Sequence, residues 1–264
     1  MFLVKIIALH FQQIFHHRLR SFIWFLIPLM NTLTLILFWS GALKNTSLSA
    51  NWNMTSVTTY YFLLTIAGAM LTSHIEDDVA QIDIQQGELV RYLIRPFPYF
   101  WIKFIEELPY RVLQGSYGIL LLVFFVTFLK LSIMITAQPT VILLTILMAI
   151  FAFSISFLIK MNMGLSAFWF TERHGFFETV TIVSIIFSGG IVPIHLLPPL
   201  VQKISYTLPF AYIAYYPIIS LQGQLAITQI YYILSIQLLW IGILFGLNRL
   251  LWFRGINKFT ALGQ

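Results

Sequence analysis

The sequence predicts an all-α membrane protein with six transmembrane helices. Hydrophobic residues make up 59% of the 264 positions, and charged residues only 9%, where soluble domains carry about 25%. The apolar residues also gather in runs close to the roughly 20 residues that a helix needs to cross the hydrocarbon core. A soluble fold of this length could not bury so much apolar side chain. The chain has no cysteine, which excludes disulfides, thiolate metal sites and cysteine nucleophiles.

We treat the chain, 1–264, as a single transmembrane domain. Its predicted spans are 22–43, 55–73, 112–130, 140–160, 176–192 and 229–250. The second span is polar at its start, and the fifth is short and ends at Gly189-Gly190. An even number of spans places both termini on the same side of the membrane.

Residues 1–21 predict an amphipathic helix that lies in the membrane interface. Apolar residues recur at helical spacing, and polar or basic residues line the opposite face. The apolar positions are Val4, Ile7, Ala8, Phe11, Phe15 and Leu19, and the polar ones are His10, Gln13, His17 and Arg20. The apolar run is too short for a signal peptide, and the histidines lack the spacing and further ligands of a metal site.

The distribution of Lys and Arg predicts the orientation, because cytoplasmic loops carry an excess of both. With the N-terminus inside, twelve basic residues fall on the cytoplasmic side and three outside, namely Lys44, Lys130 and Lys203. All nine acids fall on or beside the cytoplasmic side as well. We therefore expect both termini in the cytoplasm, in a bacterial inner membrane. The net charge of +6 follows this topology and does not indicate nucleic-acid binding.

A charged segment, 76–111, lies between the second and third predicted spans. It holds 11 of the 24 charges and seven of the nine acids. We expect 74–111 to be a cytoplasmic connection that a soluble partner could reach. Ile75, Val79 and Ile82 recur at i, i+4 and i+7, which predicts a helix with one apolar edge beside its acids.

Gly87 is expected to end that helix. A second helical turn would follow, with Leu89, Tyr92 and Leu93 on one side, and the prolines at 96 and 98 would stop it.

The outer segment 193–228 is too apolar for a free loop, yet prolines interrupt it. They are Pro193, Pro198, Pro199, Pro209 and Pro217. Each proline removes a backbone donor and prevents one continuous helix. We expect a broken re-entrant segment of short helices that dips into the outer leaflet between spans five and six, covered by protein.

Several strings resemble the permease subunit of a bacterial type-2 ATP-binding-cassette (ABC) exporter, of a subfamily often described only as a domain of unknown function. They are GELVRYLIRPFPYF (87–100), AFWFTERHG (167–175), SGGIVPIHLLPPL (188–200) and LPFAYIAYYP (208–217). Together with the interfacial helix and the six spans, the resemblance covers nearly the whole chain.

The resemblance implies that two permease subunits, identical or homologous, form the substrate pathway in the lipid bilayer. A separate ABC ATPase would drive them and would bind ATP and Mg²⁺, so this chain would need no cofactor of its own and would not be an enzyme. No G-x-x-x-x-G-K-[ST] phosphate loop occurs in the sequence, as expected for a subunit without the motor.

A cytoplasmic coupling helix between spans two and three would dock on the ATPase. The residues assigned to this coupling are Asp77, Asp78, Asp83, Glu88, Arg91, Arg95 and Pro96. Glu172 and Arg173 are candidates for a second cytoplasmic contact. The alternative for each residue is that its charge only solvates the connection.

Lys160 lies where the fourth span could continue to residue 170. Its side chain would reach the headgroups, line the substrate pathway, or pair with Glu172 or Glu178.

Two other function classes stay open. Glu76, Asp77, Asp78 and Asp83 are similar to the aspartate-rich magnesium sites of membrane prenyltransferases, although the second such motif is missing. A stand-alone secondary transporter or channel would usually carry acids deep in its spans, and none lies there.

Overall fold

The computed structural model describes residues 18–42, 52–128 and 130–259, and all the secondary structure in this part of the chain is helical apart from an isolated bridge residue, Trp52. Five helices are long. They are α2 (Arg18–Ala42), α3 (Met54–Leu71), α5 (Tyr99–Phe128), α6 (Pro139–Leu165) and α10 (Ile227–Ile256). The predicted interfacial helix 1–21 lies outside the described residues, except for its last four, which already belong to α2.

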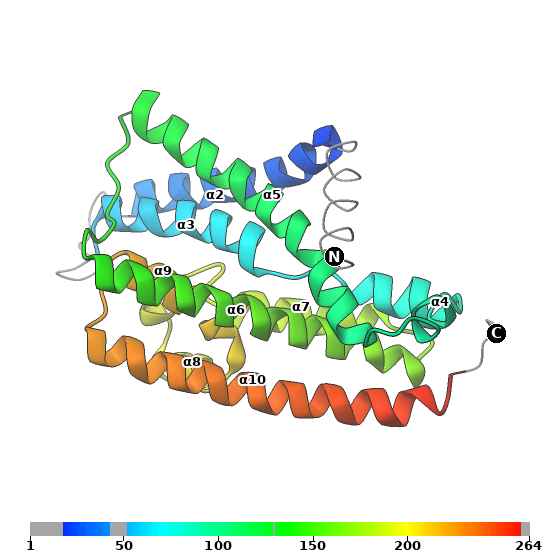
Figure 1. Ribbon diagram of the computed structural model, residues 1–264. Coiled ribbons are helices and arrows are strands. Elements are labelled where there is room, and N and C mark those ends of the chain that lie inside the picture. Colours follow the sequence, from blue (N-terminus) through cyan, green and yellow to red (C-terminus); the bar gives the residue numbers. More distant parts are fainter. Residues whose placement is uncertain (1–17, 43–51, 129, 260–264) are drawn as a thin grey trace.

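The long helices pack around α3 and α6. Helices α6 and α10 lie alongside each other and make the most extensive contact in the molecule (Figure 1). Helix α3 contacts α2, α5 and α6, and it begins after a capping box in which Asn53 and Ser56 satisfy each other's backbone amides. Helix α5 crosses over this group at an angle, as Figure 1 shows.

Four described helices are long and apolar enough to span a membrane. They are Met54–Leu71, Tyr99–Phe128, Pro139–Phe168 and Ile227–Ile256. The described apolar part of α2 is Leu29–Ala42, and α7 (His174–Phe187) has 14 residues. At 1.5 Å per residue α7 is about 21 Å long, shorter than the hydrocarbon core of about 30 Å.

Helix α5 begins 13 residues before the predicted span 112–130, at Tyr99. Pro96 and Pro98 precede its first turn. The first part of the helix is rich in charged residues, which in the sequence is typical of a loop. These charges are tolerated in a helix because most of them are paired inside the protein. Pro109 lies within α5 and costs it one backbone hydrogen bond.

The predicted outer segment 193–228 folds into short helices. They are η3 (Ile194–Leu196), α8 (Pro199–Thr207), η4 (Pro209–Tyr212) and α9 (Tyr215–Leu221). Proline begins α8 and η4, where its missing N–H is not needed.

Helix α3 holds the start of this segment. The Tyr60 hydroxyl donates to the Gly189 carbonyl at 2.8 Å, and the Tyr61 hydroxyl to the Ile191 carbonyl at 2.7 Å. Gly189 has φ +80°, and the amide of Gly190 closes the end of α7 on the Ile185 carbonyl at 3.1 Å. A left-handed glycine directly after a helix is a common C-terminal cap.

Candidate coupling site

Two short helical pieces connect α3 to α5 at the charged end of the molecule. The first is a π-helix, η1 (Asp78–Gln85), and the second is a single turn, α4 (Val90–Leu93). Gly87, with φ +82°, separates them. Figure 1 shows α4 at the same end as the described C-terminal part of the chain. We call the segment from Ile75 to Pro98 the connector.

The π-helix changes which residues face inward. Ile75 and Val79 are buried as the α-helical spacing predicts, but Ile82 is exposed, and Asp83 and Ile84 are buried instead. The prediction for Ile82 was wrong because hydrogen bonds in a π-helix close at i+5, so the inward positions recur after four to five residues.

The predicted inward face of the second helical turn also differs from the observed one. Leu89 and Tyr92 are buried, whereas Leu93 is exposed, contrary to the prediction that all three share one side.

Asp83 is fully buried and joins the connector to α5. Its Oδ2 atom accepts a hydrogen bond from the Tyr99 hydroxyl at 2.7 Å and pairs with the Lys103 ammonium at 2.6 Å. The Arg91 guanidinium lies 3.9 Å from Oδ1. Removing water from a carboxylate costs several kcal/mol unless a cation and hydrogen bonds replace it, and here α5 supplies both.

Three cations surround the buried ring of Tyr92. Lys103 lies 4.8 Å from the ring centroid, Arg91 4.9 Å and Arg95 5.3 Å. The Arg91 guanidinium also donates to the Tyr92 hydroxyl at 3.1 Å and pairs with Glu88 at 3.4 Å. Tyr92 therefore holds Arg91 of α4, and Arg95 just after it, at the surface through cation–π contacts.

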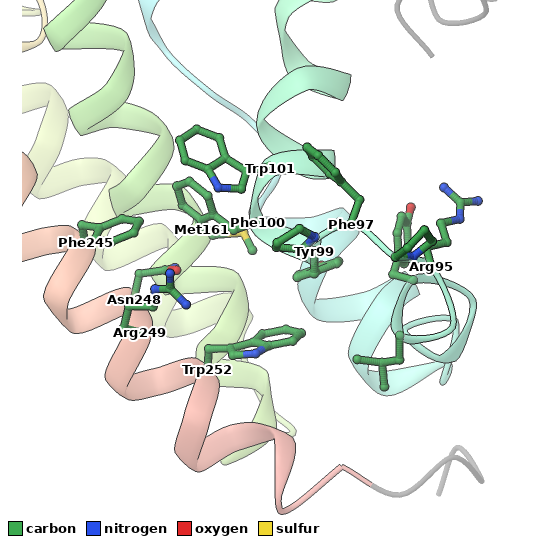
Figure 2. Close-up of a pocket in the computed structure, with 14 residues that line it drawn as sticks. Arg95, Phe97, Tyr99, Phe100, Trp101, Met161, Phe245, Asn248, Arg249 and Trp252 are labelled. Carbon is green, nitrogen blue, oxygen red and sulfur yellow. The ribbon is translucent and has the colours of Figure 1, made fainter. Parts of the chain in front are cut away.

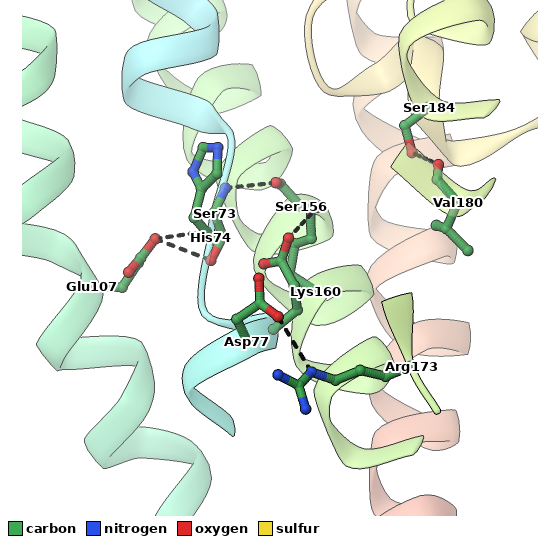
Figure 3. A network of polar contacts seen from close by, with 10 residues as sticks. Ser73, His74, Asp77, Glu107, Ser156, Lys160, Arg173, Val180 and Ser184 are labelled. Atoms are coloured by element: carbon green, nitrogen blue, oxygen red, sulfur yellow. Dashed lines mark hydrogen bonds and ion pairs between the residues drawn. The ribbon is translucent and has the colours of Figure 1, made fainter. Parts of the chain in front are cut away.

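A second group of ion pairs joins the connector to α6 and to the turn after it. Glu76 pairs with Lys160 of α6 at 2.5 Å. Arg173 donates to Gln85 at 2.5 Å and to Gln81 at 2.8 Å. Its pair with Asp77 measures 3.4 Å (Figure 3). Lys160 thus pairs with Glu76 and not with Glu172 or Glu178.

Gly164 allows η1 to approach α6 this closely. A Cβ atom at Gly164 would lie 2.6 Å from the Val79 Cβ atom and 3.1 Å from the Glu76 carbonyl oxygen. A side chain there would push the connector away from α6.

Glu107 of α5 fixes the end of α3. Its Oε1 atom accepts from the Ser73 hydroxyl and the His74 amide, both at 3.1 Å, and pairs with Arg111 at 2.8 Å. Arg111 also donates to the Ala69 carbonyl at 3.3 Å. Glu107 therefore holds the chain just after α3, and Arg111 holds the last turn of α3 itself.

The comparison with protein families identifies the chain. Residues 29–263 match the family described as ABC-2 family transporter protein. The chain belongs to this family. No curated protein and no solved structure matches it. The protein is a multi-pass membrane protein and an ABC-2 type permease, a membrane component that works with an ABC ATPase.

The permease exposes most of the residues that the sequence assigns to coupling. Asp77, Asp78, Glu88, Arg91, Arg95 and Pro96 are exposed, and so is Glu172. Asp83 and Arg173 are buried. Although Asp78 is exposed, desolvation by the surrounding protein raises the pKa of its carboxyl above the ordinary value. The Lys103 ammonium opposes this rise, and the carboxylates of Asp83 and Asp77 add to it.

The partners of these residues in the permease lie on α5 and were not predicted from the sequence. Tyr99, Lys103, Glu107 and Arg111 are all buried on α5 and recur every four residues, which places them on one side of a helix. Polar residues at this spacing, next to an apolar run, were the signal that the helix begins before residue 112.

The acids of the permease connector do not form one cluster. Glu76, Asp77 and Asp83 pair with three different cations, Lys160, Arg173 and Lys103. In the described part of the chain no group of three His, Cys, Asp or Glu residues could hold a metal ion. The carboxylates of a magnesium-dependent prenyltransferase site would have to converge on the ion, whereas these three point to separate cations.

Proposed function

We propose that this permease is half of a dimeric exporter, and that an ABC ATPase docks on its connector. The main support for a docking surface is the exposure of Ile94, which is 80% exposed at the end of α4. An exposed cluster of large apolar residues that is rimmed by charges is typical of a protein contact. Val90 and Leu93 are exposed beside Ile94, and Arg91 and Arg95 flank them.

The connector is suited to transmit movement because it is anchored to two membrane helices. The Asp83–Lys103 pair joins it to α5, and the Glu76–Lys160 pair joins it to α6. A displacement of α4 by the ATPase would therefore move both helices and not only a loop. Asp83 takes part by positioning α4, since it is buried.

Arg173 supports a second contact, in which the turn after α6 takes part. It is buried under Gln81 and Gln85, and the Gln85 amide donates to the Thr171 carbonyl at 3.1 Å. Glu172 is exposed on the same turn. We propose that Glu172 lies at the edge of the docking surface and that Arg173 stiffens it.

The proposed topology has six spans, with both termini and the connector in the cytoplasm of a bacterial cell. Helices α2 and α7 would be the two spans in addition to the four long ones. The short helices of 193–228 would enter the membrane from the outer side and return to it. The charged end supports this orientation, because the described basic residues gather there, with Lys130 and Lys203 as the exceptions. Export and the dimer are implied by the resemblance to type-2 exporters. A single six-span subunit would line only one side of a substrate pathway, and a second subunit would line the other.

The double variant Arg91→Glu, Arg95→Glu tests the docking surface. We expect at least a tenfold loss of co-purified ATPase and of ATP-dependent uptake into inverted vesicles. The single variant Arg95→Glu, whose guanidinium rests only on the Tyr92 ring among the described residues, should lose less. Lys203→Glu is the control for charge reversal at an exposed site. Wild-type co-purification together with undiminished transport in the double variant would contradict the proposal.

A mass measurement of the complex tests the pairing. We expect two permease subunits in each functional particle, whether identical or homologous. An active particle that contains a single permease subunit would contradict the dimer.

A further inference from the structure

A cavity of about 290 Å³ opens between the start of α5 and the last third of α10 (Figure 2). Half of the residues that line it are aromatic, among them Phe97, Trp101, Phe245 and Trp252. Trp252 is held in place because it stacks on Tyr99, with ring centroids 5.1 Å apart. Met161 and Asn248, both buried, also line the cavity.

Two arginines give this cavity its charge. Arg95 and Arg249 line it, and no acidic residue does. Within the described ranges neither guanidinium has a carboxylate within 4.0 Å. Arg249 rests on the Phe245 ring at 5.3 Å, and Arg95 on the Tyr92 ring at 5.3 Å.

Four other cations near the connector are paired. Lys103, Arg111, Lys160 and Arg173 each have a carboxylate partner. The uncompensated positive charge beside the cavity therefore comes from Arg95 and Arg249, on two separate elements of the chain.

We propose that this cavity binds an anionic phospholipid, with the phosphate of its headgroup at Arg249 and Arg95 and its upper acyl chain along the aromatic wall. Arginine suits phosphate because its planar N–H groups match the phosphate oxygens. Tryptophan favours the depth at which headgroup and hydrocarbon meet, and basic pockets between membrane helices on the cytoplasmic side bind anionic headgroups. The lining supplies both halves of an amphipathic ligand.

A phospholipid fits this site better than free phosphate does. The aromatic side chains outnumber the charged ones, and burial of acyl chain against them contributes roughly 25 cal/mol per Å² of apolar surface. Inorganic phosphate would gain only the contacts with the two arginines, both of which are exposed. The site does not depend on the docking of an ATPase, so the two proposals can fail separately.

The test is native mass spectrometry of the full-length permease in detergent, titrated with phosphatidylglycerol or with phosphatidylcholine. We expect retained phosphatidylglycerol on the wild type, and at least tenfold weaker retention on Arg249→Gln. Arg254→Gln is the matched control, because Arg254 is an exposed cation on the same helix outside the cavity. Arg249→Lys should retain part of the binding, because it keeps the charge but loses the fork geometry.

Three results would overturn the proposal. The first is equal retention of phosphatidylglycerol by Arg249→Gln and Arg254→Gln. The second is retention of phosphatidylcholine as strong as that of phosphatidylglycerol. The third is full displacement of the lipid by inorganic phosphate at low millimolar concentration, which would reduce the cavity to a simple anion site. Circular dichroism of each variant, compared with the wild type, separates lost binding from lost folding.

Discussion

The two ends of the permease hold their short helices in different ways. At the charged end the connector is attached by buried ion pairs, Asp83 with Lys103 and Glu76 with Lys160. At the opposite end the segment after α7 is attached by neutral hydrogen bonds from Tyr60, Tyr61 and Gln222 to backbone carbonyls. Both kinds of contact attach irregular backbone to α3, α5 or α6, but substitutions should affect them differently.

The difference lies in what remains when one partner is lost. A buried carboxylate without its cation leaves an uncompensated charge, whereas a carbonyl without its tyrosine leaves one unsatisfied acceptor. The charged end should therefore fail abruptly, and the aromatic end should weaken in small steps. An abrupt response suits a part that must move as one body with its partner.

Replacing Lys103 should have the largest effect. Lys103→Met removes the closest cation of the fully buried Asp83 and leaves only the Arg91 guanidinium at 3.9 Å, and we expect a loss of about 3–5 kcal/mol in the free energy of unfolding. The measurement is reversible unfolding in mixed micelles, followed by tryptophan fluorescence. Lys258→Met, at an exposed position near the end of α10, should change the value by no more than about 0.5 kcal/mol.

The double variant Asp83→Asn, Lys103→Met sharpens this result. Because it removes both charges, it should recover a large part of the loss caused by Lys103→Met alone. A double variant that is as unstable as the sum of the two single variants would show that the pair itself is not the source of the effect.

The position of the connector could be predicted from the sequence, but its internal contacts could not. Gly87 and the prolines at 96 and 98 mark its turns, and GELVRYLIRP gives its resemblance. The π-helix is not visible in a spacing of apolar residues, and it moved Ile82 outward and Asp83 inward. The pairing of Asp83 with Lys103 depends on that geometry.

The hydrogen bonds that attach the segment after α7 to α3 could not be predicted from the sequence either. Tyr60 and Gly189 are 129 positions apart, and nothing in either string indicates that they meet. By contrast, the prolines of 193–228 were sufficient to predict that the segment breaks into short pieces, because each proline acts on its own backbone.

Gly164 offers a second way to disturb the charged end. Gly164→Ala places a methyl group against Val79, and we expect a loss of about 1–3 kcal/mol through overpacking. Val79→Ala in the same chain should restore part of it. Gly242→Ala on α10 is the control, since nothing lies within 4 Å of its Cβ position, and it should be neutral or slightly stabilising. Equal effects at Gly164 and Gly242 would contradict the close packing of η1 on α6.

The aromatic end should show a smaller change. Tyr61→Phe removes the donor to the Ile191 carbonyl and the acceptor of the Trp39 indole N–H, each at 2.7 Å. We expect a loss of about 1–2 kcal/mol, measured as for Lys103→Met. Tyr231→Phe, on an exposed part of α10, is the control. A loss larger than that of Lys103→Met would reverse the comparison between the two ends.

At neutral pH the smallest expected effect is that of His195, because its contribution changes only as the pH falls. Burial lowers the pKa of His195 to about 4 from an ordinary value of 6.5, and its ring packs against Trp52 at an interplanar angle of 37°, with centroids 4.0 Å apart. The unfolded chain therefore binds a proton first, so stability is complete above pH 6.5 and decreases as the pH falls towards 4. His195→Asn should flatten this part of the stability–pH curve, and an unchanged curve would contradict it.

Site-specific crosslinking can show directly whether the connector is the docking surface for the ATPase. The chain contains no cysteine, so Ile94→Cys introduces a single reactive thiol at the tip of α4. Leu200→Cys places an equally exposed thiol on α8, at the opposite end. With a thiol-directed photocrosslinker we predict an adduct with the ATPase subunit from Ile94→Cys and none from Leu200→Cys. An adduct from Leu200→Cys, or none from Ile94→Cys in a complex that still transports, would contradict the account.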